Sequence, residues 1–140
     1  MKAHVGVDSK TKIIHTAVAT AANVSDVAML PDLLHGEETR VWGDGAYQGQ
    51  TEVIREGAPR ARDFTQRRCR YKGVDEVAWA KNRTKSKVRA KVEHVFQIMK
   101  LKFGFVKVRY RGLKKNAHRL FVTCALVNLF VSRRKLLAVA

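Results

Sequence analysis

The chain has 140 residues, 46% of them hydrophobic, and carries a formal net charge of +16. This length predicts a single domain, and the apolar content excludes a disordered tail. The apolar run near the C-terminus is interrupted by Asn128 and is shorter than the about 18 residues of a membrane span, and the N-terminus lacks a signal-peptide hydrophobic stretch, so we expect no membrane association.

The opening of the chain predicts a β-hairpin followed by a helix. Residues 3–8 alternate in a strand-like way, residues 13–20 are β-branched and apolar, and a short polar turn lies between them. A helix is expected over residues 25–36, with a polar cap at its start and a glycine at its end. Pro31 within this stretch predicts that the helix is kinked or starts late.

A short strand is predicted over residues 40–42, and it runs directly into the glycine-rich turn GDGAYQG. Residues 50–57 are typical of a short helix. Residues 58–85 lose the regular pattern and are rich in basic side chains. We expect a short strand or an irregular loop there, and we call this segment the basic insert.

Two long helices are predicted in the rest of the chain, over residues 85–103 and 116–136. The first has a single apolar stripe whose members are 4, 3, 4 and 4 residues apart, namely Val88, Val92, Val95, Met99 and Phe103. The second is rich in apolar residues and ends in the basic run SRRK. The whole order of elements predicts an α/β fold with a mixed sheet and flanking helices.

Basic charge is concentrated in the second half of the chain. Residues 1–60 hold six Lys and Arg against eight Asp and Glu, a net of −2, whereas residues 61–140 hold 22 against four, a net of +18. This excess favours a polyanionic partner. In the basic insert we expect contact with the DNA backbone, although a solvated surface is the alternative. The residues concerned are Arg60, Arg62, Arg67, Arg68, Arg70 and Lys72.

Two acidic positions are candidates for chemistry. Asp44 follows a predicted strand, and strand ends are where open α/β sheets place functional groups, although an aspartate before glycine is also common in turns. Arg89, Glu93 and Lys100 share one helix face, since residues four and eleven apart differ by about 40° and 20° in direction. A carboxylate between two cations suits a metal and phosphate site, but the spacing alone favours an ordinary solvated face.

Longer motifs change this balance. The segment VWGDGAYQG resembles the second catalytic-aspartate motif of bacterial insertion-sequence DDE transposases, and RAKVEHVFQIMK resembles their third-carboxylate motif. The matching residues are Asp44 in the first segment, and Arg89, Glu93 and Lys100 in the second. The opening segment and the C-terminal helix with its basic connector are also similar to the family, so the resemblance covers nearly the whole chain.

The resemblance implies an RNase H-like fold and the hydrolysis and transesterification of DNA phosphodiesters with two Mg²⁺ ions at transposon ends. It implies that Asp44 bridges the metals, that Glu93 binds one of them, and that Arg89 and Lys100 contact DNA phosphates. It also implies a protein of the bacterial cytoplasm, associated with the nucleoid. The two distant cysteines of the chain suit that reducing compartment.

The sequence departs from the family pattern at its start, because the family's first aspartate lies on a strand upstream of the hairpin. Asp8 occupies the hairpin turn instead. We therefore expect residues 1–140 to form a partial catalytic domain without its first strand, with residues 58–85 as the basic insert, and to be inactive alone. The open sheet edge predicts a homodimer or a complementing upstream fragment. The alternative function is a non-catalytic basic DNA-binding protein, which needs no approach of Asp44 to Glu93.

Overall fold

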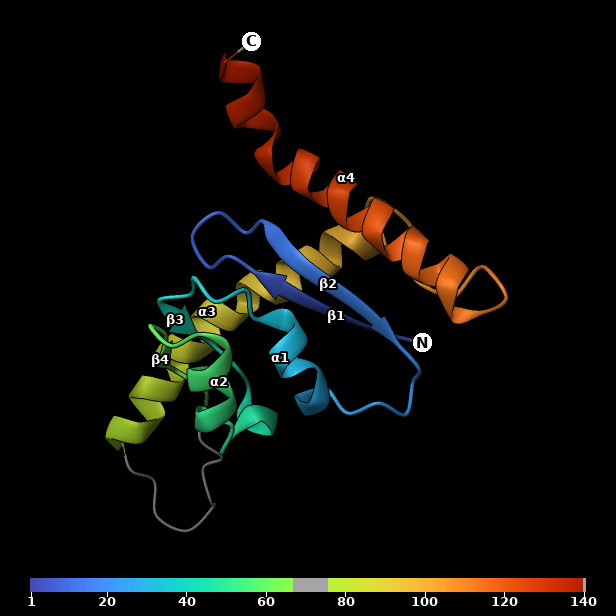
Figure 1. Ribbon diagram of the computed structural model, residues 1–140. Helices are drawn as coiled ribbons and strands as arrows, with labels where there is room; N and C mark the ends of the chain where they lie inside the picture. The colour runs from blue at the N-terminus through green and yellow to red at the C-terminus, as the bar shows by residue number, and fades with distance from the viewer. Residues whose placement is uncertain (67–75, 140) are drawn as a thin grey trace. The chain divides into compact units, whose positions relative to one another are not determined.

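A computed structural model describes residues 1–66 and 76–139 of the chain. The chain divides into two compact units, one formed by Met1–Ser25 and Lys91–Ala140 and the other by Asp26–Ala90. Figure 1 shows the elements in chain order. We describe each unit by itself and call them the hairpin unit and the central unit, respectively.

The hairpin unit contains the antiparallel strands β1 (Lys2–Val7) and β2 (Ile14–Thr20), the end of helix α3 (Glu76–Leu101) and helix α4 (Leu113–Val139). Helix α4 crosses β2 (Figure 1). The alternating side chains of the hairpin give it one apolar face, which these helices cover.

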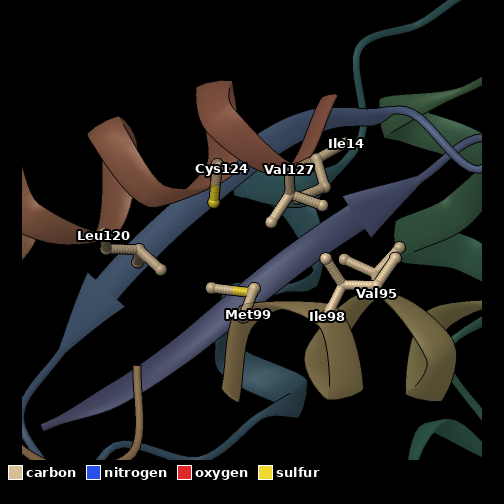
Figure 2. Close-up of a cluster of buried hydrophobic side chains, with 7 residues drawn as sticks. All are labelled: Ile14, Val95, Ile98, Met99, Leu120, Cys124 and Val127. Carbon is tan, nitrogen blue, oxygen red and sulfur yellow. The ribbon is translucent and has the colours of Figure 1, made fainter. Parts of the chain in front are cut away.

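The core of this unit lies between the hairpin and the two helices. Figure 2 shows Leu120, Cys124 and Val127 of α4 pointing toward side chains of α3, with the strands beside them. The buried cluster consists of Ile14, Val95, Ile98, Met99, Leu120, Cys124 and Val127. Val95 and Met99 of the predicted stripe belong to this core, and Phe103, which lies just past the end of α3, packs against it. Ile98 joins them although the stripe did not include it, whereas Val88 and Val92 are not part of the cluster.

Polar contacts fix the register of α4 on the hairpin. The Asn128 side chain accepts a hydrogen bond from the Ile14 amide and donates one to the Ile14 carbonyl, both at 2.8 Å. Asn116 is buried and binds the backbone of the preceding connector, accepting from the Tyr110 amide and donating to the Gly112 carbonyl. These side-chain amides supply hydrogen-bond partners to backbone groups at the start of β2 and before α4.

The central unit contains the 3-10 turns η1 (Val27–Met29) and η2 (Gly45–Tyr47) and the short helices α1 (Leu30–Leu33) and α2 (Thr51–Gly57). Its strands β3 (Arg40–Val41) and β4 (Arg62–Asp63) pair in parallel, and the first part of α3 completes it. Ile54 of α2 and Ala58 are buried at 1% and 0% exposure, which identifies the small core of this unit.

The hairpin and both long helices are confirmed, and so is the mixed α/β class, which is consistent with an RNase H-like fold. Among the described residues the strands form two two-stranded sheets, one antiparallel and one parallel. The helix expected over residues 25–36 is instead one 3-10 turn and one helical turn, because Pro31 stands at the start of α1 and removes a backbone donor.

The expectation of a loop or strand up to residue 85 is wrong for residues 76–85, which belong to α3. Alanine, lysine and arginine in this stretch favour a helix, but they form no apolar stripe that periodicity can detect. Among residues 1–66 and 76–139, no helix combines the length and apolar character that crossing a membrane requires.

Candidate active site

Asp44 stands at the tip of a strand, as the sequence predicts. The β3–β4 pairing continues past β3, because the Phe64 amide donates to the Val41 carbonyl at 2.8 Å and the Gln66 amide donates to the Gly43 carbonyl at 3.0 Å. The residue immediately before Asp44 is therefore held by the neighbouring segment. This pairing fixes the backbone just before Asp44, where the chain enters the turn η2.

Hydrogen bonds within the turn orient the Asp44 side chain. Its Oδ1 accepts from the Ala46 amide at 2.9 Å, so Asp44 caps η2, and its carbonyl accepts from the Tyr47 amide at 3.1 Å. A Cβ at Gly43 would lie 3.2 Å from the Cβ of Tyr47, so the close turn favours glycine there. Asp44 as a residue is partly buried, and one oxygen of its carboxylate binds the Ala46 amide of the turn.

Tyr47 forms one wall of this turn. Burial raises the pKa of the Tyr47 hydroxyl, and the negative charges of Asp26 and Asp44 raise it further. The phenol therefore stays neutral at physiological pH. It adds no negative charge beside Asp44.

Gln66 lies shortly after β4 and connects that segment to α3 through its side chain. Its Nε2 donates to Ser86 Oγ at 2.6 Å and to the Asn82 carbonyl at 3.2 Å, and its Oε1 accepts from an Arg89 guanidinium N–H at 2.8 Å. The backbone amide of Gln66 also donates to the carbonyl of Gly43, the residue before Asp44. Gln66 therefore joins the backbone beside Asp44 to the side chain of Arg89. The sequence analysis missed Gln66, because a single glutamine outside any motif gives no signal.

Asp63 is a second residue that the sequence analysis did not single out. Its carboxylate accepts from Thr51 Oγ1 at 2.9 Å and from the Thr65 amide at 2.7 Å. Burial raises the pKa of Asp63, but the hydrogen bonds from Thr65 and Thr51 and the charge of Lys85 outweigh it, so the pKa is lowered overall. Asp63 is therefore ionised, and its described contacts brace α2 against β4.

Arg89, Glu93 and Lys100 all lie on the continuous helix α3. Arg89 is partly buried in the central unit, whereas Glu93 and Lys100 are exposed in the hairpin unit. The structure thus links Asp44 to Arg89 through Gln66. The approach of Glu93 to Asp44 stays a prediction.

Two other sets of predicted residues have different outcomes. Asp8 Oδ1 accepts from the amides of Lys10 and Thr11 and from the Thr11 hydroxyl, so Asp8 closes the hairpin turn as expected from its position. The residues Arg67, Arg68 and Arg70 lie outside the described part of the chain, so their contact with DNA stays a prediction.

Comparison with known protein families identifies the family of this chain. Residues 1–129 match the family described as the transposase DDE domain, which covers most of the chain. The chain belongs to this family. No solved structure matches it. Membership in the DDE transposase family supports a general role in DNA transposition, with DNA as the substrate and nuclease and strand-transfer chemistry as the activity.

DDE transposases generally use Mg²⁺, and the donors of this transposase chain suit that ion. Mg²⁺ is a hard cation that prefers carboxylate oxygens and retains several waters. The carboxylate of Asp44 is held at a strand tip by the Ala46 amide, and Glu93 offers a second carboxylate on an exposed helix surface. Each carboxylate has the donor chemistry that Mg²⁺ prefers, and the binding of one ion by both stays a prediction.

Proposed function

We propose that this chain is part of a Mg²⁺-dependent DDE catalytic core that cleaves and joins DNA at the ends of a bacterial insertion sequence. One observation carries this proposal: the carboxylate of Asp44 is fixed at a strand tip, and Gln66 ties that tip to Arg89, four residues before Glu93 on α3. Transposition would take place in the cytoplasm, at the nucleoid.

Each residue of the proposed site has a separate task. Asp44 and Glu93 hold the divalent ions with their carboxylate oxygens. When bound, the ions activate the attacking water or 3′-hydroxyl and stabilise the leaving oxygen. Arg89 and Lys100 hold DNA phosphates beside them, and Arg67, Arg68 and Arg70 follow the DNA backbone.

In this proposal Asp44 and Glu93 are two of the family's three carboxylates. We propose that residues 1–140 act as a partial catalytic domain in which residues 58–85 form a basic insert, and that a further segment supplies the third acid. That segment belongs to the same polypeptide, to a second copy or to a separate fragment. Because a two-metal site needs several oxygen ligands, the 140 residues alone are expected to be inactive in strand transfer.

Metal-directed cleavage of the polypeptide tests the shared site without depending on activity. The protein is loaded with Fe²⁺ in place of Mg²⁺ and treated with ascorbate and peroxide, so that radicals cut the backbone near the bound ion. We expect cuts near both Asp44 and Glu93, and Mg²⁺ should suppress them by competition. The Asp44→Asn variant should lose the cuts near Glu93 as well, since both carboxylates hold the same ions.

The matched control is Glu52→Gln, which removes an exposed carboxylate of the same unit outside the proposed site. It should leave the cleavage pattern unchanged. Cuts near Glu93 that persist in Asp44→Asn would show that the two acids do not share metal ions.

A non-catalytic basic DNA-binding protein is the second candidate function. The net charge of +18 over residues 61–140 favours it, because this charge alone supports backbone binding. The two functions differ in their response to metal. If DNA binds equally well with and without Mg²⁺ and no Fe²⁺ cuts appear near Asp44 or Glu93, the binding function replaces the catalytic one.

A further inference from the structure

A basic pocket lies within the hairpin unit, where three segments meet. The turn after β1, the end of α3 and the C-terminal half of α4 surround a volume of about 710 Å³. Six of its lining residues are cations, and no lining residue is acidic: the cations are Lys10, Lys12, Lys102, Arg133, Arg134 and Lys135. So many like charges at one hollow repel one another, and an anion bound there would relieve the repulsion.

Apolar side chains also line the pocket. Ile98, Leu101, Phe130 and Val131 line it together with the cations. The Arg133 guanidinium lies 4.1 Å from the centroid of the Phe130 ring and donates to the Phe130 carbonyl at 2.6 Å. This contact places the charge of the exposed Arg133 side chain beside an aromatic ring.

The backbone at Lys12 has a conformation that is uncommon for lysine, within the loop between β1 and β2. Lys12 is the one residue other than glycine in the described ranges with a positive φ, at 63°. Glycine adopts this conformation without steric cost, whereas a lysine does so rarely. Non-glycine residues in such conformations concentrate at functional sites, and here the half-buried Lys12 lines the basic pocket.

The turn that presents Lys12 is rigidly held. The Lys12 amide donates to the Asp8 carbonyl at 2.9 Å, and the Asp8 side chain binds the amides of Lys10 and Thr11. Lys91 of α3 also donates to the Ser9 carbonyl, which fastens the turn to the helix. The backbone that carries Lys10 and Lys12 is therefore held in place by hydrogen bonds.

We propose that this pocket binds a short run of single-stranded nucleic acid, with phosphates on the cations and a base or sugar against the apolar wall. A volume of about 710 Å³ lies in the usual range for small-molecule sites, so it suits a few nucleotides better than a duplex. Basic side chains combined with an aromatic and apolar surface are the features by which single strands are recognised. The binding needs neither metal ions nor Asp44 and Glu93, so it goes beyond the proposed function.

Equilibrium binding in EDTA tests this pocket apart from any metal chemistry. The 140-residue chain is titrated into a fluorescent single-stranded oligonucleotide of about 12 nucleotides and into a blunt duplex of the same sequence, and anisotropy is measured at several salt concentrations. The test variant is Lys12→Gly with Arg134→Gln. Glycine at position 12 suits the positive φ, so this variant should keep its fold, which circular dichroism checks.

The control variant is Lys114→Gln with Lys115→Gln. It also removes two positive charges, but from exposed positions of α4 outside the pocket. We expect the test variant to bind the single strand about tenfold more weakly or worse, and its salt slope to fall by about 1.4, since each lost phosphate contact on a single strand lowers it by about 0.7. The control should retain most of its single-strand affinity. Equal losses in the two variants, or a loss in the test variant that is as large for the duplex as for the single strand, would overturn the proposal.

Discussion

Replacing Gln66 with alanine should loosen the connection between the strand tip at Asp44 and helix α3. The change removes three side-chain hydrogen bonds, to Ser86, Asn82 and Arg89, at 2.6, 3.2 and 2.8 Å. Each such bond contributes a net of about 0.5–1.5 kcal/mol, but Ser86 is exposed and can bind water instead. We therefore expect the free energy of unfolding of the central unit to fall by about 1–2 kcal/mol.

Tryptophan fluorescence during urea titration measures this loss. Trp42 and Trp79 are the two tryptophans of the chain, and both lie in the central unit, so the signal reports on that unit. A double-mutant cycle that combines Gln66→Ala with Arg89→Ala isolates the bond between these side chains, and we expect a coupling of about 0.5–1.5 kcal/mol.

The control for this experiment is Gln97→Ala. Gln97 is an exposed glutamine on α3, the helix that carries Arg89. It should shift the urea midpoint little. A coupling below about 0.3 kcal/mol would refute the reasoning, because it would mean that Gln66 and Arg89 contribute independently.

Three further outcomes follow from described contacts. Asn128→Ala leaves the Ile14 amide and carbonyl without their side-chain partner, so thermal melting followed by circular dichroism should show a loss of about 1–3 kcal/mol, and a loss within error would contradict this. Burial raises the pKa of Cys124 to about 11. In a variant whose other cysteine is replaced by serine, the Cys124 thiol should therefore react with a disulfide reagent at pH 8 far more slowly in the folded than in the urea-unfolded protein. Equal rates would contradict the burial of this thiol. The Thr11 amide chiefly lowers the pKa of Asp8 below the value of about 3.9 in unfolded chains, so the stability it contributes is present above about pH 4 and is lost as pH falls through the folded pKa. The urea-midpoint difference between wild type and Asp8→Asn should therefore shrink on acidification, and a difference that grows would reverse the sign of the argument.

Local patterns in the sequence were enough to predict much of this protein. Alternation predicted the hairpin, and the stripe through Val95 and Met99 predicted a helix that indeed builds the core. The motif around Asp44 predicted a strand tip and turn, and the family match confirmed membership in the DDE transposase family. Each of these features depends on residues that are close in sequence, so its signal can be read from a short window.

Only the tertiary structure decided which distant side chains meet. Asn128 binds the backbone of Ile14 across 114 positions, and Gln66 reaches Arg89 across 23. The cations of the hairpin turn join Lys102, just past α3, and the cations of α4 in one pocket although they are far apart in the chain. Such contacts arise from the way helices pack on strands, and polar side chains that meet through packing leave no periodic pattern in the sequence.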